Sequence, residues 1–212
     1  MAGADRHNRG MLRIGIDFDN TIACYDAAFY AAALERDLFD AEVAPTKGAV
    51  RDYLRRTGRE DAWTELQGYI YGPGMKFAAL FPGLVEFLAA ARERGIETHI
   101  VSHKTLHPYL GPKYDLHAAA RGFLCERGIC DDLVPSERVH FELTLPQKLS
   151  RIATLGCSHF IDDLPELLTE RDFPSGADRL LFDPNGQYPA DPHYERFAGW
   201  DEIARRLLRD DA

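Results

Sequence analysis

The chain has 212 residues, of which 45% are hydrophobic, 28% charged and 11% aromatic. This composition is typical of a globular protein with one good core and room for a smaller lobe. A formal net charge of −9 and the lack of any run of five Lys and Arg residues exclude a nucleic-acid polymer as the expected partner, although a basic pocket for one small anion stays open.

The sequence indicates a cytoplasmic protein with reduced cysteines. The first ten residues are polar and carry no apolar signal segment, so we expect a disordered N-terminus over 1–10. No apolar run is long enough to cross a bilayer, and no membrane partner is expected. The cysteines are scattered and lack the close pairs of a zinc site: Cys24, Cys125, Cys130 and Cys157.

In chain order, a strand is predicted over 12–16, and it runs into the polar segment "DFDNT". The next fifty-five or so residues, 25–80, favour helices and contain no convincing strand. An Ala-rich helix is expected first, and two short amphipathic helices are expected after it, at 25–39, 48–58 and 60–72. Turn residues in "YGPGMKF" and "FPG" then end this segment.

After Pro82 the chain alternates between helices and strands. Helices are predicted over 84–95, 113–128, 146–156 and 164–172, and strands over 96–102, 138–142, 158–162 and 178–183. A last helix is expected over 200–208, with Asp201 in a capping position. Such alternation predicts an α/β fold, in which helices cover both faces of a parallel sheet.

Polar side chains follow several of these strands: Asp17, Ser102, Asp162 and Asp163. Ligands of open parallel sheets bind beyond the carboxyl ends of the strands, so these groups should converge. Asp17 and Asp19, two residues apart, are expected to point the same way and to repel each other unless a cation lies beside them. An oxygen-only cluster suits Mg²⁺, which commonly also binds a phosphate oxygen, so we expect a phosphorylated ligand.

Four segments together resemble the motifs of the haloacid dehalogenase-like (HAD) superfamily, whose members are mostly phosphatases. They are "DFDNT", "IVSHK", Lys148 and "FIDDLPE", and their order and approximate spacing match across residues 12–182. The resemblance implies a Rossmann-like core formed by 11–24 and 81–212. It also implies a small helical cap of type one, inserted after the first strand over 25–80, that closes over the site and selects the substrate.

A looser resemblance links the latter half of the chain to the small 5'(3')-deoxyribonucleotidases. It rests on "SHK", on "IDDLPE" and on the segment between residues 103 and 117, which is rich in His, Tyr and Lys. The cap contains no motif that matches that subgroup. A nucleotide is therefore one candidate substrate among several.

The HAD resemblance implies a role for each motif carboxylate. Asp17 would be the nucleophile and Asp19 the general acid and base, with the Asp19 backbone carbonyl on Mg²⁺. Asp162 would bind the metal directly and Asp163 indirectly. The expected metal set is therefore Asp17, Asp19, Asp162 and Asp163.

The resemblance also places Ser102 and Lys148 on the transferring phosphoryl group, and we add Thr21 and His103 to the expected phosphate site. These residue types suit the chemistry, since a carboxylate nucleophile forms an aspartyl phosphate and so divides hydrolysis into two easier displacements. The negative oxygens of the phosphoryl group then need nearby positive charge and hydrogen-bond donors.

Structural roles compete with these assignments. Asp162 and Asp163 could cap the helix at 164–172, with Asp163 as the expected cap. Lys148 belongs to an amphipathic helix, in which a lysine is usually solvated, and Lys104 is its competitor for the phosphoryl contact.

Two further groups have a functional and a structural interpretation. A histidine metal site is the alternative to polar surface roles for His103, His107 and His117, but their spacing fits no common ligand pair. Aromatic residues of the segment 25–80 could stack on a substrate or belong to the core, and the core is favoured for Trp63, Tyr69 and Tyr71.

The sequence thus predicts a Mg²⁺-dependent phosphomonoester hydrolase that acts through an aspartyl phosphate on a small soluble ester, such as a nucleotide or a sugar phosphate. One alternative is a phosphotransferase that uses the same site. Another is a catalytically silent protein that binds a phosphate ligand. The intact Asp17 and Asp19 argue against this second alternative. Dehalogenation is disfavoured because a halide leaving group needs neither Asp19 nor a metal. The oligomeric state is left open.

Overall fold

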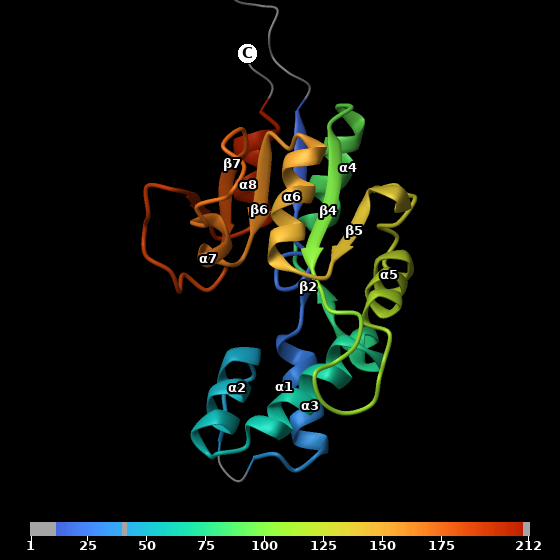
Figure 1. Cartoon of the computed structure of the whole chain (residues 1–212), viewed down its shortest axis with the longest axis vertical. Helices are drawn as coiled ribbons and strands as arrows, with labels where there is room; N and C mark the ends of the chain where they lie inside the picture. The colour runs from blue at the N-terminus through green and yellow to red at the C-terminus, as the bar shows by residue number, and fades with distance from the viewer. Residues whose placement is uncertain (1–11, 40–41, 210–212) are drawn as a thin grey trace, which may run out of the picture.

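The computed structural model describes residues 12–39 and 42–209, and the predicted disorder of 1–10 lies outside this part. An α/β lobe and a helical lobe meet at a narrow waist (Figure 1). Six parallel strands form the sheet of the α/β lobe in the order β5-β4-β1-β6-β7-β8. These strands are β1 (Arg13–Ile16), β4 (Glu97–His103), β5 (Val139–Glu142), β6 (His159–Asp162), β7 (Asp178–Phe182) and β8 (Glu195–Phe197).

The α/β fold predicted from the alternation is confirmed. Strand β1 lies in the middle of the sheet, where Ile14 pairs with Thr98 of β4 on one side and His159 of β6 on the other. Strand β8 was not predicted, because only three residues form it and none of them is buried. Its place at the edge of the sheet explains why it lacks a buried pattern.

Helices cover both faces of the sheet. Helices α4 (Leu84–Glu93), α5 (Leu116–Glu126) and α8 (Trp200–Leu207) share one core with Ile100 and Ile161, whereas α6 (Leu145–Leu155) and α7 (Pro165–Leu168) share another with Val101 and Phe160. Neighbouring strand residues therefore enter opposite cores, as the two-residue period of a strand requires. Figure 1 shows α6 in front of the sheet.

The helical lobe lies between two strands of two residues each, β2 (Ala23–Cys24) and β3 (Ala79–Leu80), which pair antiparallel. It contains α1 (Asp26–Glu35), α2 (Lys47–Arg56), α3 (Glu60–Tyr71) and the 3-10 helix η1 (Pro73–Phe77). The expectation of no strand within 25–80 was wrong, because β3 is too short to show alternation. The β2–β3 pair brings the two connections between the lobes side by side.

Aromatic side chains form the core of the helical lobe. Trp63 is 2% exposed and stacks on Phe29, with their ring centroids 4.9 Å apart. The Arg36 guanidinium lies 4.0 Å from the centroid of Tyr69. The core interpretation of Trp63 is confirmed. The ring of Tyr69 makes a cation–π contact with Arg36.

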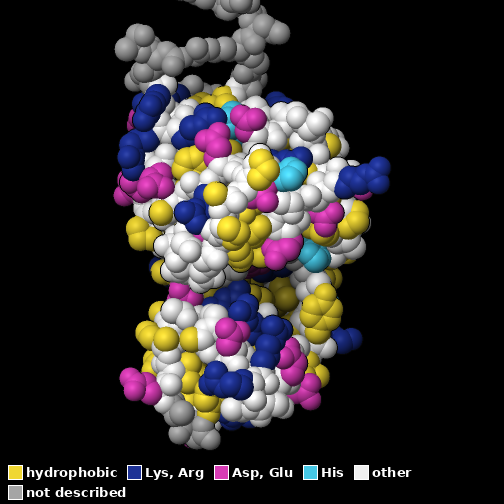
Figure 2. Space-filling view, turned by 90° about the vertical axis from the view of Figure 1, so that its left-hand side faces the viewer, with side chains coloured by type: hydrophobic (Ala, Val, Ile, Leu, Met, Phe, Trp, Pro, Cys, Tyr) yellow, Lys and Arg dark blue, Asp and Glu magenta, His cyan; other side chains and the backbone are white. Residues whose placement is uncertain are grey.

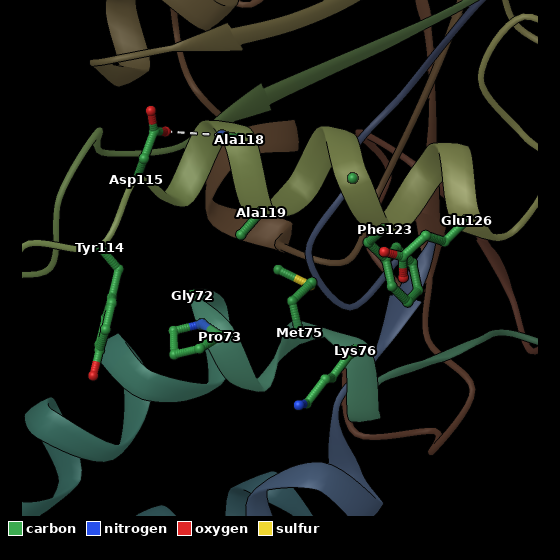
Figure 3. Close-up of a pocket in the computed structure, with 11 residues that line it drawn as sticks. Gly72, Pro73, Met75, Lys76, Tyr114, Asp115, Ala118, Ala119, Phe123 and Glu126 are labelled. Atoms are coloured by element: carbon green, nitrogen blue, oxygen red, sulfur yellow. Dashed lines mark hydrogen bonds between the residues drawn. The ribbon is translucent and has the colours of Figure 1, made fainter.

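A groove of about 440 Å³ separates η1 from α5. Figure 3 shows Pro73 and Met75 of η1 facing Ala119 and Phe123 of α5 across it. No motif carboxylate lines this groove. The groove lies beside the connection between the lobes, so it belongs to the contact between the lobes and not to the site at the strand ends.

The predicted cap of the last helix was wrong. Gly199 is the N-cap of α8 and makes no side-chain cap hydrogen bond, whereas Asp201 lies in the first turn and pairs with Arg205. Glu202 instead accepts a hydrogen bond from the backbone N–H of Ala198, at 2.7 Å. A carboxylate in the first turn also stabilises a helix, through its interaction with the helix dipole. Acidic residues are therefore common both at the N-cap and just after it, and for this reason the sequence pattern misplaced the cap.

No helix in the described parts of the chain is both long and apolar enough to cross a membrane.

Two histidines stack in the sheet, with their ring centroids 5.6 Å apart. His140 lies beside His99, with Nε2 3.4 Å from Nδ1, and His99 Nε2 lies 2.7 Å from Glu97 Oε1. Burial, together with Arg151 and His99, lowers the pKa of His140 to about 4. Between about pH 6.5, the usual histidine value, and pH 4, the unfolded chain binds a proton that the folded chain does not.

We therefore expect His140 to make stability fall as the pH drops from about 6.5 toward 4. Urea unfolding of wild type and His140→Gln across this range measures the effect, and the variant should lose less stability on acidification. His107→Gln, at an exposed histidine, is the control. Equal pH slopes for wild type and His140→Gln would contradict the assignment.

Candidate active site

The chain turns sharply directly after β1. The Asp17 N–H donates to the Ile161 carbonyl at 2.9 Å, which holds Asp17 beside the end of β6. Phe18 points into the core, and its carbonyl accepts from the N–H groups of Ile22 and Ala23, both at 3.0 Å. This turn ends the strand geometry at Asp17.

Carboxylates from the ends of β1 and β6 form a cluster. Oxygen atoms of Asp17, Asp162 and Asp163 lie within 4.8 Å of one another. Lys148 in the first turn of α6 bridges two of them, with Nζ 2.5 Å from Asp17 Oδ1 and 2.6 Å from Asp162 Oδ2. Segments that are distant in the sequence thus converge, as the strand-end argument predicted.

The cluster carries more negative than positive charge. Burial, opposed by Lys148 and reinforced by Asp17, raises the pKa of Asp162 to about 6. Burial and the neighbouring Asp162 and Asp17 raise the pKa of Asp163 well above its usual range. Burial alone would lower the pKa of Lys148, but Asp162 and Asp17 raise it. A divalent cation would relieve this repulsion, so the donor set fits Mg²⁺.

Asp19 belongs to a separate ion pair. Lys104 Nζ lies 2.9 and 2.8 Å from the two Asp19 carboxylate oxygens, and the Tyr25 hydroxyl donates to Oδ1 at 2.5 Å. Burial opposes ionisation, yet Lys104 and Tyr25 lower the pKa of Asp19. The expectation that Asp17 and Asp19 share one cation was wrong for the side chains, because the turn carries the Asp19 carboxylate outside the cluster. The role of its backbone carbonyl stays a prediction.

The two candidate lysines are both buried but contact different carboxylates. Lys148 contacts Asp17, the predicted nucleophile, whereas Lys104 contacts Asp19. Ser102, at the end of β4, is 1% exposed. This geometry favours Lys148 over Lys104 as the residue beside the attacking carboxylate.

Thr21 and His103 differ from each other in their placement. Thr21 is fully buried, and its Oγ1 has no hydrogen-bond partner among the described residues, while its carbonyl accepts from Trp200 Nε1 at 3.2 Å. His103 is exposed, and its Nε2 lies 3.2 Å from the Leu143 carbonyl. Because adjacent strand residues point to opposite faces, the burial of Ser102 turns His103 away. The phosphate role expected for His103 therefore lacks geometric support.

The expected cap of α7 was wrong. Asp163 does not cap this helix, because Leu164 is the N-cap and its N–H donates to Asp162 Oδ1 at 2.9 Å. The histidines have the favoured polar roles, since His107 Nδ1 bonds to the Tyr114 carbonyl and His117 Nε2 to the Lys104 carbonyl. Within the described residues, the aspartate cluster is the group suited to a metal.

The helical lobe contributes Lys47, which the sequence analysis missed, and Tyr71, for which it favoured a place in the core. Lys47, the first residue of α2, donates to Asn20 Oδ1 at 2.9 Å, and Asn20 Nδ2 donates to Asp163 Oδ2 at 3.1 Å. Tyr71 lies beside both lysines, with its ring centroid 4.8 Å from Lys104 Nζ and 5.5 Å from Lys47 Nζ. Lys47 follows Thr46, the N-cap of α2. Nothing else in the sequence distinguishes Lys47 from an ordinary solvent-exposed lysine.

A cavity of about 240 Å³ opens beside the cluster, between the two lobes. Asn20 and Asp163 line it beside the cluster, α2 contributes Lys47 and Arg51, and the loop after β7 contributes residues 183–185, 187 and 188. A small ester held at the carboxylate cluster could therefore extend into this space.

No protein-family model and no curated protein sequence matches the chain. Solved structures do match it. A dehalogenase has 14% sequence identity and a TM-score of 0.60, with 95% of this chain and 99% of that chain covered. A protein described as a predicted phosphoglycolate phosphatase, from Haemophilus somnus, has 16% identity and a TM-score of 0.58, with 92% and 97% covered.

A third match is the HAD-hydrolase YfnB from Bacillus subtilis, whose structure was solved with bound magnesium. It has 14% identity and a TM-score of 0.55, with 92% of this chain and 98% of that chain covered. The chain therefore has the fold of HAD-superfamily hydrolases, as its motifs predicted. The narrower resemblance to the deoxyribonucleotidases stays a prediction.

Proposed function

We propose that this chain, which has the HAD hydrolase fold, is a Mg²⁺-dependent phosphomonoester hydrolase acting on a small soluble phosphate ester. The observation that carries the proposal is the separation of two carboxylates with different partners. Asp17 lies in a carboxylate cluster with Lys148, whereas Asp19 is held by Lys104 and Tyr25 outside it. Such a division suits one nucleophile and one separate acid and base.

In the proposed reaction, Asp17 attacks phosphorus and displaces the alkoxide, which forms an aspartyl phosphate. Lys148 and Ser102 would bind oxygens of the transferring phosphoryl group. Asp19 would donate a proton to the leaving oxygen and would then accept one from the water that releases phosphate. The negative charge of an arriving phosphate raises the proton affinity of Asp19, which offsets the effect of Lys104.

The carboxylates of Asp17, Asp162 and Asp163 would hold Mg²⁺. The ion would neutralise charge on the phosphoryl oxygens. The chain's own residues explain why charge compensation is needed, because Asp17 alone would repel an incoming phosphate dianion. The bound magnesium of the YfnB structure supports this choice of metal.

Rival functions use parts of the same site. A phosphotransferase would pass the group from Asp17 to an acceptor other than water, and product analysis with candidate acceptors would reveal it. A silent binding protein would need no acid such as Asp19. Dehalogenation, suggested by the match to a dehalogenase, would use Asp17 but would leave Asp19 and the extra carboxylates without a role.

Phosphatase activity on an activated aryl phosphate should require Mg²⁺ and stop in excess chelator. Ca²⁺ should support it poorly, because Ca²⁺ prefers more ligands and longer bonds and would engage the Asp17 carboxylate that must attack. The measurement is initial rate against metal concentration. Thermal unfolding gives a second readout, in which Mg²⁺ should raise the melting temperature of wild type more than that of Asp162→Asn. Full turnover in excess chelator would refute the metal assignment.

A further inference from the structure

We propose that the substrate carries a second anionic group, a carboxylate or a second phosphate, that binds to Lys47 and Arg51 of α2. The proposal rests on the proposed function, since it takes the carboxylate cluster as the place of the reacting phosphoryl group. It adds the class of substrate, which is a small phosphate ester of an acid.

Lys47 has no carboxylate in direct contact. Among the described residues it makes no ion pair, its Nζ donates to the neutral amide oxygen of Asn20 at 2.9 Å, and Asp19 and Asp163 attract it only at longer range. The rings of Tyr25, Phe29 and Tyr71 surround Nζ, with centroids 5.6, 5.7 and 5.5 Å away. These rings hold the ammonium in one place beside the cluster, where it can still accept an anion.

Arg51 lies one helical turn farther along α2 and lines the same cavity. Its side chain is 43% exposed and pairs with the adjacent Asp52, which is 61% exposed. Exposed pairs of this kind contribute little free energy. A ligand anion inside the cavity could therefore replace Asp52 at small cost.

The carboxylates of the cavity are already engaged. Asp26 accepts the backbone N–H of Lys47 at 2.8 Å. Asp183 accepts the N–H groups of Gln187 and Tyr188, at 2.9 and 3.0 Å. Asp163 belongs to the metal-binding cluster and accepts from Asn20.

Both cations of the cavity, Lys47 and Arg51, lie on α2, whereas its carboxylates lie on other elements. Figure 2 shows several Lys and Arg side chains on the helical lobe directly below the waist. The net charge of the chain is −9, so a local group of cations facing the site is contrary to the overall trend. An anion at the far end of the ester would meet these cations while its phosphoryl group lies at Asp17.

Matched esters that differ in one group test this inference. 3-Phosphoglycerate and glycerol 3-phosphate differ by a carboxylate in place of a hydroxymethyl group, and phosphoglycolate and 2-hydroxyethyl phosphate form a shorter pair of the same kind. We expect kcat/KM to be about 10- to 100-fold higher for the acid of the longer pair, the worth of one or two hydrogen bonds to charged groups.

The ratio of kcat/KM for the acid to kcat/KM for the alcohol should fall toward one in Arg51→Gln for the longer pair. In Lys47→Gln it should fall toward one for both pairs. Arg55→Gln is the matched control, because Arg55 lies on α2, pairs with Glu60 and does not line the cavity. This control should retain the wild-type ratio. A wild-type ratio near one, an unchanged ratio in Arg51→Gln, or a nucleoside monophosphate that outperforms both acids would overturn the proposal.

A binding experiment keeps this inference separate from the proposed function. Phosphonoacetate and ethylphosphonate cannot be hydrolysed, and they differ by a carboxylate. With Mg²⁺ present, calorimetry should show about 10-fold tighter binding of phosphonoacetate, and Lys47→Gln should remove this preference. If the protein hydrolysed no aryl phosphate, the proposed hydrolase function would be refuted, but the proposed binding of a second anionic group would not. If the two phosphonates bound with equal affinity, the binding of a second anionic group would be refuted even in an active enzyme.

Discussion

Asp17→Asn should abolish hydrolysis, with a loss on the order of 10⁴-fold or more in kcat, the scale seen when a covalent nucleophile is removed. An amide is too weak a nucleophile to form the phosphorylated intermediate. The variant keeps the shape of the side chain, and its amide oxygen can still accept a hydrogen bond from Lys148. The loss should therefore appear for all substrates, including activated aryl phosphates with good leaving groups.

Folding should survive this substitution. The Asp17 charge contributes to the raised pKa of both Asp162 and Asp163, so its removal relieves repulsion while Lys148 keeps one carboxylate partner. Initial rates and thermal melting measured together separate catalysis from stability. Asp172→Asn, at an exposed aspartate, is the control and should match wild type in both. Rapid turnover by Asp17→Asn would remove the nucleophile assignment.

The strand ends were the most predictable part of the site. Asp17 follows β1 and Asp162 ends β6, and the parallel pairing of these buried strands places their carboxyl ends at the same edge. Lys148 could be placed there only through the HAD resemblance, because its helix position alone is typical of a solvated lysine. The structure shows it 3% exposed.

The direction of Asp19 was not predictable from a two-residue period. The chain leaves the strand conformation at Phe18, and Asn20 adopts a left-handed backbone with φ of 59°. Asparagine tolerates this conformation better than most residues, but "DFDNT" gives no direct sign of where Asp19 will point. The partner of Asp19, Lys104, comes from the next motif and directly follows β4, the strand that neighbours β1.

The contribution of the helical lobe was hidden for a different reason. Lys47 and Tyr71 acquire their roles from the approach of two lobes, which no local pattern encodes. Both occupy terminal positions of helices, Lys47 at the start of α2 and Tyr71 at the end of α3. Periodicity identifies the buried face of such helices, but it does not identify which helix end meets the other lobe.

Asp19→Asn should reduce kcat for alkyl phosphates by about 10²- to 10⁴-fold, the usual worth of acid and base catalysis. The nucleophile remains, but the leaving alkoxide loses its proton donor. The defect in the first step should therefore shrink for aryl phosphates, whose leaving groups depart without a proton. Burst kinetics with a series of aryl phosphates of different leaving-group pKa, compared with alkyl esters, measures this dependence.

Loss of the ion pair with Lys104 is expected to lower stability as well. Lys104 is 4% exposed, so its ammonium would lose its carboxylate partner inside the protein, although the rings of Phe18 and Tyr71 remain 5.2 and 4.8 Å away. Assays well below the melting temperature, with folding checked by circular dichroism, keep the catalytic effect separate.

The second step gives a direct test of the two roles. Water that attacks the aspartyl phosphate also needs the Asp19 base, so Asp19→Asn should react with an aryl phosphate and then stall with the phosphoryl group on Asp17. Mass spectrometry of the rapidly quenched protein, with peptide mapping, should locate it there, and Asp17→Asn treated in the same way should carry none. If the Asp19→Asn defect were equal for every leaving group and no phosphorylated protein accumulated, Asp19 would not be the acid and base, and its contact with Lys104 would serve the fold alone.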